Sequence, residues 1–267
     1  MNTKFRLLTI ALVVAIFSVQ CTTNDSNTPQ LPTSIEQNFK AGSNTYEGIT
    51  LQYQECSISA SAAGKNSLVV VLHGQYANGS DNRSQLRQDA MIRIWHHLNS
   101  NKVKSIMLAP QCPINYSWDE NPADLKRASM SECLNSLIEN FLTKNPTIDI
   151  SRIYILGYSD ANEPAGGGGV WRMLTDYTDL FAAGMCVAAD PDDSIIAKNI
   201  AKTPLLSVKG QSDVHAVALT LDSFGDQVRD EGGTLREEVL NFQSREDLCR
   251  EAFSKERLDW VMQFSRK

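Results

Sequence analysis

One segment of the sequence carries residues whose types and spacing could support covalent chemistry. It reads GYSDANEPAGGGGVW, from Gly157 to Trp171, and follows the apolar run RIYIL. A serine flanked by small residues at a sharp strand-to-helix turn presents its hydroxyl as a nucleophile, because the two backbones nearly touch there. Ser159 has a glycine two positions before it, so we expect it to be such a nucleophile.

Five extra residues stand between this serine and the Ala-Gly run that the turn needs. Without DANEP, residues 160–164, the sequence reads GYSAGGGGVWRML and has the spacing of a tight turn. Pro164 suits the first turn of a helix, so we expect a helix that starts there and a loop between it and Ser159. That loop would take the serine away from the helix N-terminus. It would also weaken the backbone N–H of Asp160 as a donor to the oxyanion, the charged oxygen that forms when the serine attacks a carbonyl. Losing one such donor costs about 100- to 1,000-fold in rate.

A sheet must hold this turn in place. The runs TLQYQECSIS, SLVVVL, KSIML, RIYIL, AAGMCV, LLSV and LREEVL have the residue types of strands, several of them buried on both faces. Helical apolar patterns alternate with these runs. They cover residues 85–99, 130–141, 217–228 and 258–262, and another begins at residue 170. The alternation predicts an α/β fold with a mostly parallel sheet and helices on both faces, and ligands of such sheets bind at the carboxyl ends of the strands.

Polar segments follow four of these runs and carry a family resemblance. They read HGQYANGSDN, PQCPINYSW, GYSDANEPAGGGGVW and KGQSD. Together they resemble the α/β-hydrolase superfamily, in particular its secreted esterase and "predicted peptidase" branch, near the polyhydroxybutyrate-depolymerase and feruloyl-esterase groups. The resemblance runs from about Ser67 to the C-terminus and implies an α/β-hydrolase fold.

The resemblance also implies roles for individual residues. Ser159 would attack an ester, or less readily an amide, and form an acyl-enzyme without a metal or cofactor. The backbone N–H groups of Gln75 and Asp160 would bind the oxyanion. Asp213, after LLSVKGQS, takes the place of the acid, and Asp190, after the preceding strand, is the less favoured alternative.

The general base is the missing part of this pattern. The family's histidine comes after the last strand, but that region reads LNFQSREDLCREAF, with Arg245 or Glu246 at the expected place. Arginine stays protonated, and a glutamate is a weak base near neutral pH unless its pKa is strongly raised. His215, two residues after Asp213, is the candidate substitute.

Two further aromatic residues are candidates for the substrate site. His73, in the HG pair, is expected to pack beneath the oxyanion loop and to contribute to substrate binding. Trp118, after PQCPINYS, is expected to line the pocket, with core packing as the alternative. His96 and His97 are expected to form an exposed pair on a surface helix.

Three hypotheses for function remain open at this point. The first is an active serine esterase, and the second is a catalytically impaired relative that binds a glycan or an ester in the former active-site pocket. The third is a nucleotide-binding site formed by the glycine run, in which Asp190 would bind the ribose. GGGGVW lacks the third glycine of that motif, so we do not favour the third hypothesis.

The N-terminal segment predicts export. A short basic start and the apolar run LLTIALVVAIFSV indicate a signal peptide over residues 1–20. Cys21 lies where bacterial lipoproteins are cleaved and lipidated, so we expect a membrane lipid anchor, with a periplasmic or secreted protein as the alternative. The polar segment 21–45 is expected to be a flexible tether and residues 46–267 the hydrolase domain.

Composition excludes some partners. The 267 residues are 42% hydrophobic and 21% charged with a formal net charge of -6, and basic residues form no run that would bind nucleic acid. No two of the six cysteines have metal-ligand spacing, and the sequence fixes no disulfide pairing.

Overall fold

The computed structural model describes residues 31–58, 64–159, 165–210, 220–242 and 244–267. Within these ranges, eight strands form one sheet in the order β1-β2-β4-β3-β5-β6-β7-β8. Their bounds are β1 Lys40–Tyr46, β2 Ile49–Ile58, β3 Asn66–Leu72, β4 Ser105–Gln111, β5 Ile148–Tyr158, β6 Ala183–Val187, β7 Leu205–Gly210 and β8 Leu235–Leu240.

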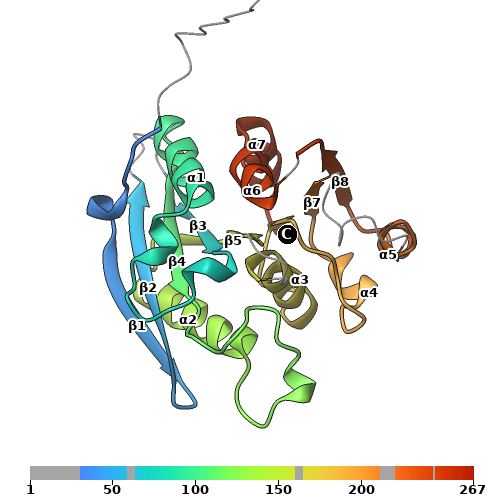
Figure 1. The fold of residues 1–267 in the computed structure, drawn as a ribbon, viewed down its shortest axis with the longest axis horizontal. Coiled ribbons are helices and arrows are strands. Elements are labelled where there is room, and N and C mark those ends of the chain that lie inside the picture. The colour runs from blue at the N-terminus through green and yellow to red at the C-terminus, as the bar shows by residue number, and fades with distance from the viewer. Residues whose placement is uncertain (1–30, 59–63, 160–164, 211–219, 243) are drawn as a thin grey trace, which may run out of the picture. The chain divides into compact units, whose positions relative to one another are not determined.

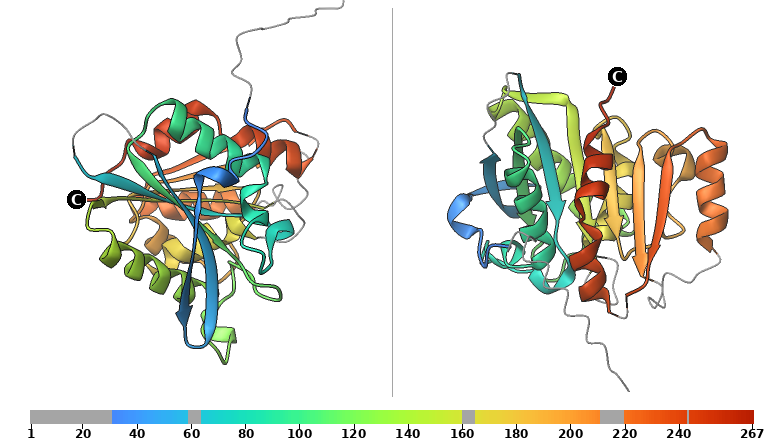
Figure 2. Two further views of the ribbon diagram at one scale, coloured as in Figure 1. Left: turned by 90° about the vertical axis from the view of Figure 1, so that its left-hand side faces the viewer. Right: turned by 90° about the horizontal axis from the view of Figure 1, so that it is seen from above.

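The sheet is mostly parallel, as the sequence predicts. The first two strands pair antiparallel as a hairpin, and β2 pairs antiparallel with β4. From β4 to β8 every neighbouring pair is parallel. The sheet twists across its width, so that β1 and β2 run at a large angle to the later strands (Figure 2).

Helices cover both faces of this sheet. Their bounds are α1 Asp89–Ser100, α2 Met130–Lys144, α3 Gly166–Asp176, α4 Ala197–Ile200, α5 Thr220–Asp230, α6 Arg245–Ala252 and α7 Lys255–Met262. One hydrophobic core lies between the sheet and α2, α3, α4 and α5, and the other between the sheet and α1, α6 and α7 (Figure 1). The predicted α/β layering is therefore confirmed.

Local sequence explains where α2 begins. Ser129 and Glu132 form a capping box, in which each side chain bonds the backbone N–H of the other residue. The apolar stripe that follows is buried against the sheet, and its members are Cys133, Leu134, Leu137, Ile138 and Phe141. The helix thus starts at its polar cap and is held by its apolar face.

The strand order defines the position of a binding crevice. The chain passes from β3 to β4 on one side and then returns to β5 on the other side of β3. Ligands of open α/β sheets bind at the carboxyl ends of strands where the order reverses. Here those ends belong to β3, which leads into Gly74, and β5, which leads into Ser159.

The N-terminal part of the sheet differs from the sequence expectation. Residues 31–45 were expected to belong to a tether, yet β1 pairs with β2 from Lys40↔Glu55 to Tyr46↔Ile49, and Ile35 is fully buried. The strand escapes pattern analysis because it lies at the edge of the sheet and its side chains are exposed or half-buried. Backbone hydrogen bonds, and not an apolar face, attach it to the sheet.

Two further properties follow from the described residues. None of their helices has the length and apolar character needed to cross a bilayer. The five cysteines within these ranges are all reduced and buried, so no disulfide links them: Cys56, Cys112, Cys133, Cys186 and Cys249.

Candidate active site

Ser159 directly follows the last residue of β5. Its backbone N–H donates to the carbonyl of Val187 at 3.0 Å, and its own carbonyl accepts from Cys249 Sγ at 3.4 Å. The side chain is fully buried, and Oγ has no hydrogen-bond partner among the described residues. A buried hydroxyl without a partner is uncommon in folded proteins and marks a position with a possible chemical role.

Glycines bring the start of α3 against this strand end. A Cβ on Gly157 would lie 2.0 Å from the carbonyl oxygen of Gly166, and a Cβ on Gly166 would lie 2.3 Å from that of Leu72. A Cβ on Gly167 would lie 3.1 Å from Ser159 Oγ. The serine side chain therefore lies beside the first turn of α3.

This placement differs from the expected effect of the DANEP segment. The helix begins at Gly166, with Ala165 as its N-cap, two residues later than the expected start at Pro164. The serine keeps its place near the helix N-terminus because Gly157 and Gly166 pack backbone to backbone. Residues 160–164, including the proposed donor Asp160, lie outside the described residues.

Ser159 does not have a left-handed backbone. Five non-glycine residues in the described ranges have positive φ, and Ser159 is not among them. The nucleophile of an α/β-hydrolase sits on a sharp, strained turn. Ser159 lies at the end of a strand, as that nucleophile does, without a positive φ.

His73 fixes the loop that follows β3. Its Nε2 accepts from the backbone N–H of Cys112 at 2.9 Å, so the neutral ring carries its proton on Nδ1 and donates to the carbonyl of Gly74 at 2.6 Å. Burial lowers the pKa of His73 to about 4, which keeps the ring neutral. With both ring nitrogens bound to backbone and no exposed surface, His73 supports the loop from beneath.

The loop offers a free backbone donor. Gln75 starts the short 3-10 helix Gln75–Ala77, so its N–H has no acceptor within that helix. This N–H donates no hydrogen bond to any other described residue. Gln75 also lines a pocket of about 290 Å³, together with Asn78, Tyr116, Ser117, Trp118 and Ala165.

Trp118 connects this pocket to the loop support. Only 2% of it is exposed, and its ring packs edge-on against His73 with 5.5 Å between centroids. Its indole N–H has no partner among the described residues. Trp118 therefore belongs to the hydrophobic core and also lines this pocket.

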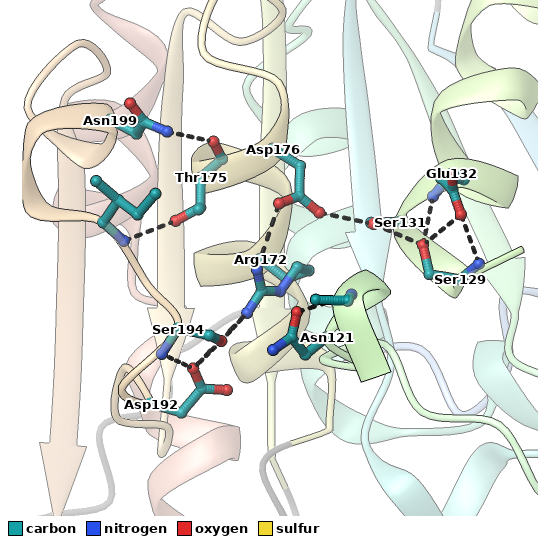
Figure 3. Close-up of polar contacts among 12 residues, drawn as sticks. Asn121, Ser129, Ser131, Glu132, Arg172, Thr175, Asp176, Asp192, Ser194 and Asn199 are labelled. Atoms are coloured by element: carbon teal, nitrogen blue, oxygen red, sulfur yellow. Dashed lines mark hydrogen bonds and ion pairs between the residues drawn. The ribbon is translucent and has the colours of Figure 1, made fainter. Parts of the chain in front are cut away.

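A polar network connects α3 to its neighbours. Ser131 donates a hydrogen bond to Asp176 at 2.7 Å, and Arg172 bonds both Asp176 and Ser194 (Figure 3). Arg172 is only 3% exposed and also lies 3.7 Å from Asp192. The network joins α2, α3 and the loop after β6.

A half-buried carboxyl lies next to the pocket wall. Asp119 follows Trp118 and accepts a hydrogen bond from Ser117 Oγ. Burial raises the pKa of Asp119 to about 6, and the nearby charges of Asp192 and Glu120 add to the effect. This carboxyl therefore exchanges its proton close to neutral pH.

Asp190, the alternative acid, is already paired. Its carboxylate lies 2.6 Å from Nζ of Lys209, at the ends of the neighbouring strands β6 and β7. Lys209 is 5% exposed, so the pair is largely shielded from water. An ion pair of this kind occupies the carboxylate that a ribose or a histidine would otherwise use.

The glycine run serves packing. Gly166, Gly167 and Gly169 lie within α3, where added Cβ atoms would meet Leu72, Val187 and Trp118 respectively. These glycines let the helix approach the sheet and do not form a loop that could surround a phosphate. Within the described residues there is also no cluster of three or more His, Cys, Asp or Glu side chains suited to a metal ion.

Several proposed site residues lie outside the described residues. These are Asp160, Asp213, His215 and Cys21, and the side chain of Glu246 is likewise not described. The three described histidines have partners away from Ser159. His73 bonds backbone, and His96 lies 3.2 Å from Ser100 Oγ. His97 was expected to be exposed but is buried, with Nε2 3.2 Å from Asp259.

Comparisons with known proteins agree with this geometry. No protein-family model and no curated protein matches the sequence. A thermostable esterase of known structure is 24% identical, covering 87% of this chain and 64% of its own, with a TM-score of 0.73. This chain thus spans less than two thirds of that esterase.

Two other solved structures match over nearly their whole length. A feruloyl esterase module from Clostridium thermocellum is 10% identical, with 90% of this chain and 98% of the module covered and a TM-score of 0.57. An S-formylglutathione hydrolase from Staphylococcus aureus is 14% identical, with 84% and 99% covered and a TM-score of 0.57. The protein therefore has the α/β-hydrolase fold, as its sequence predicts.

Sequence reasoning missed three residues at this site. Gln88 and Lys209 bond groups at the strand ends, and Ala165 lines the pocket in front of α3. In the sequence without residues 160–164, Ala165 directly follows Ser159. This spacing is the signal that could have identified Ala165. For Gln88 and Lys209 the sequence holds no comparable pattern.

Proposed function

We propose that the protein is an exported serine hydrolase of carboxylesterase type. Ser159 Oγ attacks the ester carbonyl, the alcohol leaves with a proton from the base, and water then hydrolyses the acyl-enzyme. Asp213 orients the base, for which His215 is the candidate. The proposal rests on the contact of Gly157 with Gly166, which places Ser159 at the end of β5 beside the first turn of α3.

The packed glycines suggest a different second oxyanion donor. If Gly166 serves as the second small residue of the turn, Ala165 directly before it would take the place that follows the serine in a tight turn. Ala165 and Gln75 line the same pocket. We therefore assign the two donors to the N–H groups of Gln75 and Ala165, in place of Asp160.

Ester hydrolysis and covalent labelling test this function. Short-chain nitrophenyl esters and feruloyl esters are the first substrates, because solved esterases share the fold. The purified protein should hydrolyse them and react with a fluorophosphonate probe, and Ser159→Ala should abolish both. Ser57→Ala, which changes an exposed serine on β2, is the matched control. Undiminished labelling and turnover in Ser159→Ala would rule the proposal out.

A second candidate is a hydrolase fold that binds a ligand without turning it over. It is favoured by the full burial of Ser159 and by the polar partners of the three described histidines, none of which is Ser159. This candidate predicts no labelling and no hydrolysis, together with saturable binding of an ester or oligosaccharide in calorimetry. Loss of that binding in Trp118→Ala, with the fold retained, would place the ligand in the pocket.

Export through a lipid anchor is a separate part of the proposal. It rests on the apolar run LLTIALVVAIFSV and on Cys21 after it. Expression of the full chain in a bacterium with an alkyne-bearing fatty acid should label the protein and direct it to the membrane fraction. Cys21→Ala should remove the label, and an unchanged label would contradict lipidation at this position.

A further inference from the structure

Both backbone polar groups of Gly74 are hydrogen-bonded. Its carbonyl accepts from His73 Nδ1, and its N–H donates to Gln88 Oε1 at 3.3 Å. Gly74 is buried, whereas Gln75 beyond it is exposed. The next N–H along this loop is that of Gln75, which lines the pocket, and its direction depends on how Gly74 is held.

The same side-chain oxygen of Gln88 bonds the serine strand. Tyr158 donates its hydroxyl to Gln88 Oε1, and Tyr158 is the last residue of β5, directly before Ser159. Tyr158 is 1% exposed, and its ring packs edge-on against Phe253 with 5.9 Å between centroids. One oxygen atom thus links the strand that carries the serine to the loop that carries the donor.

Gln88 makes this link in place of capping its own helix. It is the N-cap residue of α1, but its side chain makes no capping hydrogen bond. Changing the side chain therefore removes the link without removing a helix cap. The backbone of Gln88 is held in place by α1, because this helix packs against the sheet through its buried apolar residues.

We propose that Gln88 and Tyr158 are positioning residues, which hold the Gln75 N–H at the distance from Ser159 that an oxyanion requires. The proposal rests on the proposed esterase function. An oxyanion donor acts mainly in the transition state, so its displacement should lower kcat and leave KM nearly unchanged. A shift of about 1 Å in such a group can cost about 100-fold in rate.

Two kinetic variants and two controls test the link. Gln88→Leu and Tyr158→Phe should each lower kcat by about 10- to 100-fold and change KM by less than about twofold. Gln88→Glu retains an acceptor oxygen and should recover most of the rate. Tyr154→Phe is the matched control, because this buried tyrosine on the same strand bonds the carbonyls of Met262 and Phe264, away from the loop.

Hydrogen exchange tests the same link without reference to activity. The Gly74 amide should exchange at least about 10-fold faster in Gln88→Leu than in the parent or in Tyr154→Phe. Unchanged exchange would overturn the link. Faster exchange with unchanged kcat would overturn the positioning role and leave the esterase function standing. A parent without hydrolysis would overturn the esterase function, and with it the positioning role, while exchange still reports whether the link exists.

Discussion

Gly157 on β5 and Gly166 in α3 touch backbone to backbone, although eight residues lie between them. A Cβ on Gly157 would approach the Gly166 carbonyl oxygen to 2.0 Å and the carbonyl carbon to 2.6 Å. The turn around Ser159 therefore keeps its packing even with residues 160–164 inserted behind the serine. The insertion changes the length of the connection and not the contact between strand and helix.

Gly157→Ala should destabilise the protein strongly, because neither backbone segment can move away from the added methyl group. We expect the free energy of unfolding to fall by about 3 kcal/mol or more, measured by urea denaturation. Gly184→Ala is the control. Its Cβ would meet Leu174 and Leu205 methyl groups at 3.1 Å, which can shift slightly, so its cost should stay near 1 kcal/mol. Equal costs for the two variants would contradict the rigid contact.

Much of this fold can be predicted from sequence, and the exceptions have physical reasons. NSLVVVL in β3 is recognisable because both faces of a central strand are buried. KAGSNTY in β1 is not, because an edge strand needs only backbone bonds. The serine and its glycines are local features and are visible in the sequence. The link from Gln88 to Tyr158 joins residues 70 positions apart and depends on one side-chain rotamer, so no local pattern reports it.

Ala165→Pro should remove one oxyanion donor. The φ of Ala165 is -76°, which proline adopts, and proline has no N–H. If Ala165 is the donor, kcat should fall about 100- to 1,000-fold while the melting temperature stays within a few degrees of the parent. Ala165→Ser keeps the N–H and should stay within a few fold. A fully active Ala165→Pro enzyme would return the role to another residue.

Stability should fall in mild acid because of His73. Its pKa is about 4 in the folded protein and about 6.5 when unfolded, so the unfolded state binds more protons between these values. The folded state therefore loses up to about 3 kcal/mol as the pH falls from 6.5 to 4. The difference between the parent and His73→Asn should show this loss.

The His73 comparison needs a matched background. Burial also lowers the pKa of His97, so both proteins should carry His97→Gln. Denaturation curves measured at steps of half a pH unit then report the contribution of the His73 ring to stability. A difference curve that is flat from pH 6.5 to 4 would show that the His73 ring does not stay neutral in the fold.

Asp119 should act with the opposite sign in an overlapping range. Its pKa is raised to about 6 in the folded protein, against about 3.9 when unfolded, so the folded state holds the proton more strongly. The ionised carboxylate therefore destabilises the fold above pH 6, and this cost disappears below about pH 4. Asp119→Asn, which can still accept from Ser117, should be about 1–2 kcal/mol more stable than the parent at pH 7, after allowance for partial exposure. The two proteins should converge in stability as the pH falls through 6 to 4. If the variant is less stable at pH 7, interactions of the ionised carboxylate stabilise the fold more than burial of the charge opposes it.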